Sequence, residues 1–572
     1  MQAAKVIQHK IIAIFVVTFC IMGAIMGRLF QLQIKQTSTL YTQGQKNFLR
    51  LEKTLSPRGN ILDVNGTLLA TNRPLTNLTW RGTGNRKLNQ EQIDALTVVE
   101  KILGKPLHTD PHQHSLITKA ERQYKQLILA SDINYEQLSQ IKEQLPLHAN
   151  LILSTHFMRF YPYKSYASHI LGYLGQFNVE PEGKMGLEKV LEETLKGESG
   201  LILKKINSFG RNLAETELKR SLAGTNITTT LDIRMQELLE ELYPEDRTGT
   251  FIIMDPANGN IVALLSRPTF EPSLFLNPIP TDEWSALQEK HPFINRAFSG
   301  SYPPGSLFKL VSISAALEKG LITAESTWYC SGAVTFAGRL YHCHNRMGHG
   351  ELTIRDAVAN SCNTLFYNIG KHISIDTLAE YAQRFGLGQK TNVIFPEKEG
   401  LIPTNQWKRA VKGERWWPGE TLSATIGQSF LQVTPIQIAC MISSIFTGYL
   451  VKPRILVDEP VVKKPLRIQP TTLDLLRKSM RLVVTKGTGR TGGTQDIEIY
   501  AKTSTAQISD YSKREQFLEH GGFAGYISYK HHRPLTFVIW VEKAGSSQVA
   551  KDIARHFFVE YKKLMDQESA NS

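Results

Sequence analysis

Three short groups of residues, far apart in the chain, carry side chains suited to nucleophilic acyl transfer. The first group is Ser306 followed three residues later by Lys309, with a Pro-Pro-Gly breaker before the serine and apolar residues at helical spacing after the lysine. The pair therefore lies at the start of a predicted helix, where positions i and i+3 share a face. A lysine amine whose pKa is lowered by burial or by nearby cations can take a proton from a serine hydroxyl and activate it as a nucleophile.

The same pair also has an ordinary structural interpretation. Ser306 is a suitable N-cap residue, and Lys309 would then be a solvated residue of the first helical turn. A Ser-x-x-Lys pattern occurs by chance in a chain of 572 residues. The assignment of Ser306 as a nucleophile therefore depends on the other two groups.

The second group is a Ser-x-Asn formed by Ser361 and Asn363. A serine hydroxyl both donates and accepts hydrogen bonds, so Ser361 can pass a proton. The amide of Asn363 can hold either Lys309 or an amide of the substrate.

The third group lies on a predicted strand around residues 499–507, which carries Lys502, Thr503 and Thr505. A cation beside two hydroxyl groups suits a substrate that ends in a carboxylate. The edge of such a strand can also pair with an extended peptide.

The elements that must position these groups indicate an α+β domain. Residues 248–266 form a predicted hairpin, because Asn258-Gly259 between two apolar runs is a strong turn signal. Further patterns predict helices at 308–318, 354–369, 375–384 and about 549–565, and strands at 497–503, 521–529 and 535–543. This order predicts a five-stranded antiparallel sheet packed between helices.

The N-terminus predicts a membrane anchor. Lys5 and Lys10 precede an uncharged apolar run over residues 11–27, and no acidic residue occurs before Glu52. We expect a transmembrane helix over residues 11–30, with residues 1–10 in the cytoplasm and the rest of the chain outside. A cleaved signal peptide is the alternative, but the apolar run is long for one and has no convincing cleavage site.

Length and charge restrict the class of protein. A chain of 572 residues is too long for one core, and its 41% hydrophobic content is that of an ordinary multidomain globular protein. The net charge of +14 fits nucleic acid or an anionic membrane surface. Because the sequence has no zinc finger, RNA-binding signature or long Lys/Arg run, we expect the protein to associate with a membrane and not to bind nucleic acid.

The cysteines suggest a metal site beside the second group. Cys330, Cys343 and Cys362 lie close in sequence, with His349 between the last two. Three thiolates and one imidazole make a four-coordinate zinc site. Such a site would brace the Ser-x-Asn group, because Cys362 stands inside it.

Other arrangements of these cysteines remain open. In an exported chain Cys330 and Cys343 can form a disulfide, which would leave Cys362 free, or neither bond nor metal forms. His342 and His344 flank Cys343 and can replace a ligand. Cys20 lies in the predicted anchor and Cys440 in an apolar helix, where it is expected to be core.

The order Ser-x-x-Lys, Ser-x-Asn, Lys-Thr-x-Thr is the signature of penicillin-recognising serine enzymes. The chain resembles the class B penicillin-binding proteins, and most closely the elongation-specific penicillin-binding protein 2 subfamily. Stretches that look like the pedestal motifs of the family occur at 58–66, 186–188 and 230–232. Stretches that resemble the elongation-specific subfamily rather than the division-specific one occur at 348–350, 404–408, 418–421, 426–428 and 434–437. The resemblance implies an elongated pedestal of the dimerisation type, built of strands and helices, over residues 31–240, and a transpeptidase domain over residues 241–572.

The resemblance also implies an activity, the cross-linking of peptidoglycan stem peptides during cell elongation. Ser306 would attack the D-Ala–D-Ala carbonyl with Lys309 as base and Ser361 as proton relay, and an acceptor amine would then take the acyl group. The backbone N–H groups of Ser306 and Thr505 would hold the oxyanion. The terminal carboxylate would bind Lys502, Thr503 and Thr505.

The same resemblance implies a setting for the protein. We expect a single-pass protein of the bacterial inner membrane with its catalytic domain on the periplasmic side, acylated by penicillins and other β-lactams. The implied partners are a lipid-linked glycan polymerase and a scaffold protein of the elongation machinery. The chemistry needs no organic cofactor, although some members of the subfamily carry zinc before the Ser-x-Asn group.

Other functions of the same fold remain as alternatives. A D,D-carboxypeptidase or β-lactamase would use water in place of the acceptor amine, although the long N-terminal region argues against a β-lactamase. A membrane-bound β-lactam sensor or an inactive scaffold would not complete the reaction.

Two positions depart from the family pattern. Ser504 stands where the third motif usually has glycine, so its side chain must either point away from the substrate or intrude on it. Ser429 stands where the family usually has the last glycine of Gly-Gln-Gly.

Overall fold

The computed structural model describes residues 2–145, 148–177, 180–206, 212–276, 279–494, 496–508 and 518–571. The chain divides into two compact units that are interleaved in sequence. The first consists of Met1–Arg58, Asn72–Met158 and Lys196–Gly224, and the second of Gly59–Thr71, Arg159–Leu195 and Thr225–Ser572.

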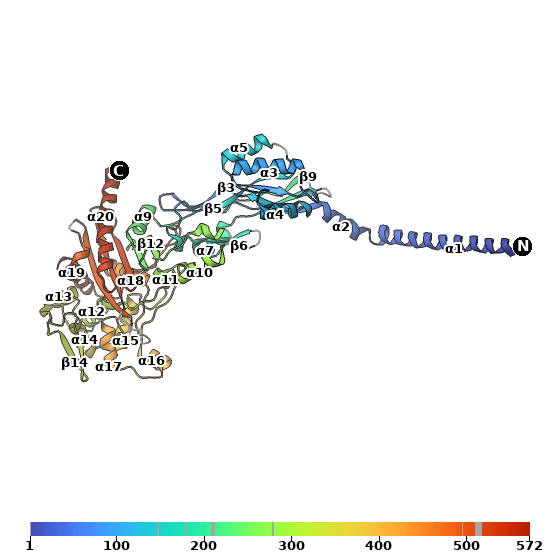
Figure 1. Cartoon of the computed structure of the whole chain (residues 1–572). Helices are drawn as coiled ribbons and strands as arrows, with labels where there is room; N and C mark the ends of the chain where they lie inside the picture. Colours follow the sequence, from blue (N-terminus) through green and yellow to red (C-terminus); the bar gives the residue numbers. More distant parts are fainter. Residues whose placement is uncertain are drawn as a thin grey trace. The chain divides into compact units, whose positions relative to one another are not determined.

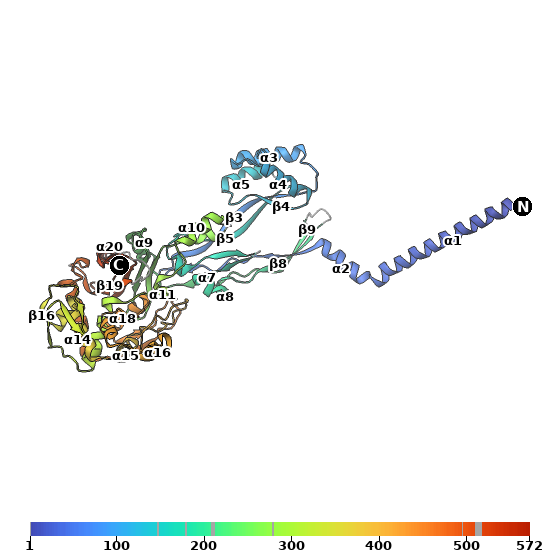
Figure 2. The ribbon, with the colours of Figure 1, turned by 60° about the horizontal axis from the view of Figure 1, so that its bottom comes forward.

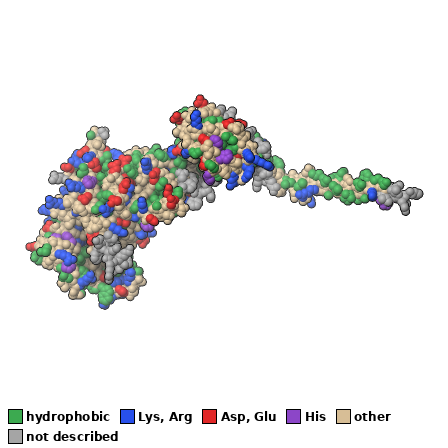
Figure 3. All heavy atoms as spheres, viewed as in Figure 1, with side chains coloured by type: hydrophobic (Ala, Val, Ile, Leu, Met, Phe, Trp, Pro, Cys, Tyr) green, Lys and Arg blue, Asp and Glu red, His purple; other side chains and the backbone are tan. Residues whose placement is uncertain are grey.

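The N-terminal helix is the one segment among the described residues that is long and apolar enough to cross a membrane, over His9–Lys35. It consists of α1 (Gln2–Phe30), which continues through a π-helical turn, η1 (Gln31–Lys35), before α2 (Thr37–Phe48) begins. Its apolar side chains are exposed along its length (Figure 3). Exposure of so many large apolar side chains is expected of a helix that faces lipid.

The rest of the first unit contains two groups of strands and a small helical layer. Helices α3, α4 and α5 lie together beside β4 in two views (Figures 1 and 2). The helices are α3 (Gln90–Leu103), α4 (Pro111–Arg122) and α5 (Tyr135–Gln144). The strands are β1 (Leu49–Thr54), β8 (Gly200–Ile206) and β9 (Asn212–Lys219) in one sheet, and β3 (Leu68–Arg81), β4 (Gln126–Ala130) and β5 (Leu151–Phe160) in another.

The second unit is built on a five-stranded antiparallel sheet in the order β12-β11-β21-β20-β19, so the predicted sheet is confirmed. Its strands are β11 (Gly249–Met254), β12 (Ile261–Arg267), β19 (Glu498–Ile508), β20 (Leu518–Ser528) and β21 (Leu535–Val541). Side chains alternate between its two faces. Phe251 and Ile253 pack with α9 (Ile233–Leu242) and α20 (Gln548–Asn571), whereas Ile252 and Met254 join the core on the other face.

The helices on that other face form the bulk of the second unit. They are α12 (Lys309–Glu318), α13 (Ile354–Ala359), α14 (Asn363–His372), α15 (Ile375–Arg384), α16 (Asn405–Lys412), α17 (Pro418–Thr425), α18 (Pro435–Thr447) and α19 (Pro470–Thr485). Of these, α12, α14, α15, α16 and α17 lie together below the sheet in Figure 1. Short hairpins surround them: β13 (Thr327–Cys330) with β16 (Gly350–Thr353), β14 (Ala333–Phe336) with β15 (Arg339–His342), and β17 (Tyr449–Val451) with β18 (Lys463–Pro465).

The remaining elements of this unit are short, apart from α10. They are β2 (Ile61–Leu62), α6 (Ser168–Leu171), β6 (Leu174–Phe177), β7 (Glu180–Gly183), α7 (Gly186–Val190), α8 (Glu192–Leu195), β10 (Ile227–Thr228), η2 (Pro272–Leu276), α10 (Thr281–Glu289), α11 (Arg296–Ser299), η3 (Gly305–Leu307) and η4 (Arg490–Gly492).

One predicted helix, over residues 354–369, is wrong because the structure divides it into α13 and α14. Ser361, between the two, has a φ of +54°, a left-handed conformation that no α-helix continues through. The amide of Cys362 donates to the carbonyl of Ala357 at 2.8 Å, which closes the first helix. The Ser-x-Asn group therefore lies on a turn and at the start of the helix that follows.

Candidate active site

The candidate nucleophile lies on a tight turn. Ser306 is in η3, and α12 begins only at Lys309, so the predicted helix start is displaced by a 3-10 turn. Gly305 has a φ of +51°, a conformation that favours glycine. Its amide donates to the carbonyl of Gly427 at 3.0 Å, which fixes the turn against the loop after α17.

Lys309 is fully buried and is held by the second group. Its Nζ donates to the carbonyl oxygen of Ser361 at 2.7 Å, to Ser361 Oγ at 3.0 Å and to Asn363 Oδ1 at 2.7 Å. Burial lowers the pKa of the Lys309 ammonium to about 7. At that value a substantial fraction of the amine is neutral near pH 7, as a general base must be.

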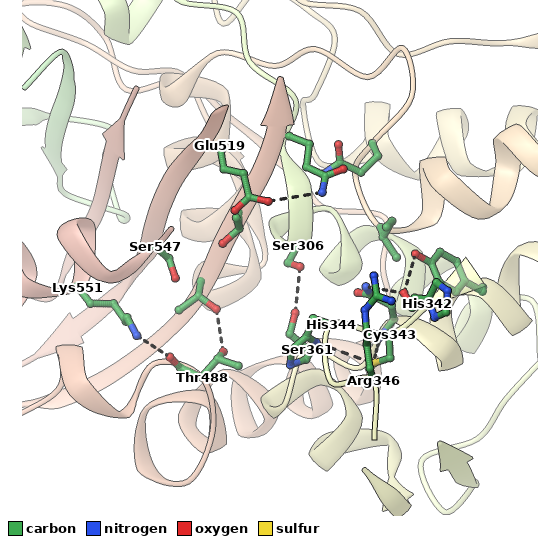
Figure 4. Close-up of a pocket in the computed structure, with 17 residues that line it drawn as sticks. Ser306, His342, Cys343, His344, Arg346, Ser361, Thr488, Glu519, Ser547 and Lys551 are labelled. Atoms are coloured by element: carbon green, nitrogen blue, oxygen red, sulfur yellow. Dashed lines mark hydrogen bonds between the residues drawn. The ribbon is translucent and has the colours of Figure 1, made fainter. Parts of the chain in front are cut away.

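Ser361 connects this lysine to the nucleophile. Its Oγ donates to Ser306 Oγ at 3.0 Å, and the two hydroxyls point toward one another in Figure 4. The path for a proton from Ser306 to Lys309 in this geometry therefore passes through the Ser361 hydroxyl. The sequence predicted direct approach along the helix, but the left-handed turn at Ser361 brings a relay between them.

Lys502 is also buried, and it contacts the same hydroxyl group, that of Ser361. Its Nζ donates to Ser361 Oγ at 3.0 Å and to the carbonyl oxygen of Thr503 at 3.2 Å. Burial, and then the charge of Lys309, lower the pKa of Lys502. Two ammonium groups buried beside one hydroxyl repel each other. The arrangement therefore disfavours the state in which both lysines are protonated at the same time.

A cleft of about 760 Å³ opens in front of these groups. The side chains that line it include Ser306, Ser361, Asn363, Thr503, Thr505, Gln428, Thr488, Glu519, Ser547 and Lys551. Figure 4 shows Lys551 reaching toward Thr488 from α20. The cleft therefore brings all three predicted groups to one place.

Several of the lining residues were not predicted from the sequence, among them Thr488 and Lys551. Thr488 Oγ1 lies 2.7 Å from Thr503 Oγ1, and Lys551 Nζ donates to the carbonyl oxygen of Thr488 at 3.3 Å. Thr488 adds a hydroxyl group to those of Thr503 and Thr505, and Lys551 adds a cation beside them. This combination suits a bound carboxylate. No local pattern marks either residue, since each reaches the cleft only through tertiary packing, that of α19 against β19 and of α20 against β20 and β21.

The predicted metal ligands also come together. One ligand atom from each of Cys330, Cys343, His349 and Cys362 lies within 4.8 Å of the others. The three sulfurs belong to free, buried cysteines, and Cys343 Sγ lies 3.7 Å from His349 Nδ1. Four soft donors at this spacing fit a tetrahedral zinc ion.

The cysteine group touches the catalytic residues directly. The backbone amide of Asn363 donates to Cys343 Sγ at 3.3 Å, and the carbonyl oxygen of His342 accepts from Asn363 Nδ2 at 3.4 Å. A hydrogen bond from the Cys362 thiol lowers the pKa of Cys343 and raises the pKa of Cys362. Of these two thiols, Cys343 therefore ionises more easily. Cys440 is buried in α18, apart from this group.

The two departures from the family pattern differ in their physical consequences. The Ser504 side chain points away from the cleft, because Thr503 and Thr505 face it and neighbours on a strand alternate. Ser429 has a φ of +71°, in the left-handed region that glycine adopts most easily.

Comparison with known proteins agrees with this geometry. The profile of the penicillin-binding protein transpeptidase domain matches residues 249–558, more than half of the chain, and that of the penicillin-binding protein dimerisation domain matches residues 53–229. The peptidoglycan D,D-transpeptidase MrdA of Acinetobacter baumannii is 28% identical, over 98% of this chain and 89% of the relative. MrdA of Escherichia coli K12 is 26% identical, over 83% of this chain and 76% of the relative.

Solved structures are similar over almost the whole chain. A protein from a peptidoglycan synthase complex that coordinates polymerization and crosslinking has 29% identity and a TM-score of 0.76, with 97% of this chain and 98% of that chain covered. A penicillin-binding protein, PBP2, solved in complex with MreC from Helicobacter pylori has 25% identity and a TM-score of 0.74, with 90% and 99% covered. With its transpeptidase domain preceded by a dimerisation domain, the chain belongs to the class B penicillin-binding proteins.

Proposed function

We propose that this chain is a peptidoglycan D,D-transpeptidase of cell elongation, with Ser306 as its nucleophile. The observation that carries the proposal is the continuous hydrogen-bonded path from Ser306 through Ser361 to the buried amine of Lys309. If Ser306 had only a structural role, the fold would not need a buried lysine with a lowered pKa at the end of that path.

Acylation begins when the Ser306 hydroxyl loses its proton. The proton passes to Ser361 Oγ, which gives its own to the neutral amine of Lys309. Ser306 Oγ bonds to the carbonyl carbon of the penultimate D-Ala, and the backbone N–H groups of Ser306 and Thr505 hold the oxyanion. The C–N bond to the terminal D-Ala then breaks, and its nitrogen takes a proton back through Ser361.

Deacylation reverses this path with a different amine. An amino group of a second stem peptide attacks the ester carbonyl and gives a proton toward Lys309. The cross-linking amide forms as the C–O bond to Ser306 breaks, and Ser306 Oγ takes that proton back through Ser361. In the preceding acylation step, the hydroxyls of Thr503 and Thr505 hold the terminal carboxylate of the donor, with Lys502 behind them acting on Ser361.

The four soft donors would hold a structural zinc ion. Cys330, Cys343, His349 and Cys362 would bind it, and it would supply no chemistry to the reaction beyond fixing its ligands in place. Because the Asn363 amide donates to Cys343 Sγ, the ligands in turn fix the Ser-x-Asn group against Lys309.

The proposal includes a setting for the enzyme. The apolar helix would anchor the chain once in the inner membrane, with residues 1–10 in the cytoplasm and the transpeptidase domain, residues 241–572, in the periplasm. Residues 31–240 would be the non-catalytic pedestal. Its partners would be a lipid-linked glycan polymerase and an elongation scaffold protein, as the PBP2–MreC complex and the synthase complex suggest.

Covalent labelling tests the proposal. Wild-type protein should be labelled by a fluorescent penicillin, and Ser306→Ala should not. Given a stem pentapeptide and an amine acceptor, wild type should release D-Ala and form the cross-linked product. An unlabelled wild type would reject the enzymatic proposal, and labelling of Ser306→Ala would reject the nucleophile. Release of D-Ala without cross-linked product would indicate a carboxypeptidase.

A further inference from the structure

The side chain of Ser504 lies behind the cleft, between the nucleophile turn and the sheet. Its Oγ donates to the carbonyl oxygen of Pro304 at 2.7 Å, and the residue is only 1% exposed. Pro304 stands two positions before Ser306, and Ser504 immediately precedes Thr505. The bond therefore joins the two segments whose backbone N–H groups hold the oxyanion in the proposed reaction.

Gly305 leaves space beside this hydroxyl, and Gly522 lies opposite it on the next strand, where the Trp540 ring packs closest. A Cβ added at Gly305 would lie 2.5 Å from Ser504 Oγ. A Cβ added at Gly522, the partner of Ser504 across the ladder between β19 and β20, would lie 3.2 Å from Ser504 Cβ. The hydroxyl is thus enclosed on both sides and kept on the Pro304 carbonyl.

The turn has other supports, but they hold its opposite side. The Gly305 amide donates to Gly427, and Tyr302 exchanges two main-chain hydrogen bonds with Val433, at 2.9 and 2.8 Å. These bonds anchor the turn to the segment after α17. The Ser504 hydroxyl anchors it to β19.

We propose that Ser504 is a positioning residue for acylation. Its hydroxyl fixes the separation between the Ser306 turn and β19, and thereby aligns the N–H groups of Ser306 and Thr505 on one developing oxyanion. Such donors act only when both lie about 2.7–3.1 Å from that oxygen, so a small relative shift of the two segments weakens one of them. The inference rests on the proposed function.

The first test uses Ser504→Ala, which removes the hydroxyl alone, and Ser504→Gly, which restores the residue usual in the family. Ser479→Ala is the matched control, because Ser479 is equally buried and its Oγ donates to the carbonyl of Leu475 at 2.7 Å within α19. Penicillin titration counts the competent sites in each preparation. Per competent site, we expect both Ser504 variants to acylate about tenfold more slowly, a smaller loss than removing an oxyanion donor outright. Ser479→Ala should acylate at the wild-type rate.

The second test reads the oxyanion site itself. An acyl-D-Ala ester is compared with its thiono analogue, in which sulfur replaces the carbonyl oxygen and accepts hydrogen bonds poorly. The preference for the oxygen ester should fall in both Ser504 variants and stay unchanged in Ser479→Ala. An unchanged preference, or a rate loss that vanishes once competent sites are counted, would overturn the inference. A wild type that does not acylate at Ser306 would instead reject the proposed function, and this inference with it.

Discussion

The two walls of the cleft hold their functional groups by different means. On the helical wall, Lys309, Ser361 and Asn363 are held by side-chain hydrogen bonds between segments distant in sequence. On the strand wall, Thr503 and Thr505 lie on β19, whose register is set by continuous pairing with β20. A ladder of main-chain bonds is insensitive to most single side chains, whereas a network of three side chains depends on each of them.

This difference separates the roles of the walls. The helical wall holds the groups that exchange protons, and the cysteine cluster adjoins it. On the strand wall, the hydroxyls of Thr503 and Thr505 do not titrate near pH 7 and would bind the substrate, whereas Lys502 of the same strand directs its amine to Ser361. Substitutions on the helical wall should therefore change the rate of acylation, and substitutions on the strand wall should change the affinity for the donor.

The largest effect should come from Lys309→Met. The substitution removes the base and leaves the buried Ser361 carbonyl and Asn363 amide oxygen without their donor. We expect acylation by a fluorescent penicillin to slow by about 10²–10⁴-fold. Thr503→Val on the opposite wall should mainly raise KM for a carboxylate-ended donor. A Lys309→Met rate within tenfold of wild type would contradict the assignment of the base.

Cys362→Ala should have the next largest effect. Loss of one ligand should abolish bound zinc, release the Ser-x-Asn group and slow acylation by about 10–100-fold. The control is Cys440→Ala, which removes a buried thiol in α18 outside the cluster. Zinc content and acylation rate are measured on the same preparations. A variant without zinc that acylates at the wild-type rate would show that the metal does not brace the motif.

The pH profile should show the lowered pKa of Lys309, which burial brings to about 7. The protonated amine cannot accept a proton, so acylation should accelerate as pH rises through 7 and then level off. Between pH 6 and pH 8 we expect an increase of about tenfold. Donor KM should change little over the same range. A rate that is flat or falls between these values would contradict Lys309 as the base.

Lys551→Met tests the strand wall and its neighbour α20. The Lys551 ammonium lies at the end of the hydroxyl row beside Thr488, where it can face the donor carboxylate. Because Lys551 is partly exposed, we expect KM to rise only about two- to fivefold, with kcat unchanged. Lys562→Met on the same helix is the control, since Lys562 pairs with Asp496. An amidated donor should be insensitive to Lys551→Met, and an equal rise for both donors would refute a carboxylate contact.

The smallest effect should come from Ser429→Gly. Ser429 has a φ of +71°, which costs a residue with a side chain about 1–2 kcal/mol. Glycine avoids this cost, but it loses more backbone entropy on folding, which offsets part of the gain in stability. We expect the free energy of unfolding to rise by up to about 1 kcal/mol, measured by thermal melting. The same change at Ser423, inside α17, should lower it. A lower melting temperature for Ser429→Gly would show that its side chain compensates the strain.

Most functional groups of the helical wall could be predicted from the sequence, because they belong to short local motifs. Ser-x-x-Lys and Ser-x-Asn are local patterns, and the hydrophobic periodicity around them located α12 and the five strands. The break at Ser361 could not be predicted, because residues 354–369 keep a helical pattern while contacts from Lys309 stabilise a left-handed turn. Tertiary contacts overrode the local pattern there.

On the strand wall, too, the roles of some residues could be predicted from the sequence and those of others could not. Once Thr503 and Thr505 are assigned to the cleft, strand alternation alone directs Ser504 away from it, so the choice between pointing away and intruding could have been made from the sequence. Thr488 and Lys551 could not have been found, since they belong to a loop and a helix that reach the cleft only in the folded unit.

The close packing at Ser504 also limits what evolution can place there. Ser504 is only 1% exposed and its hydroxyl lies close to the Gly305 turn, so a side chain larger than serine would displace the turn, whereas glycine and alanine are smaller. Single-nucleotide changes connect these three amino acids. A lineage can therefore move among them in single steps and change the link between the nucleophile turn and β19, at a position that does not line the cleft.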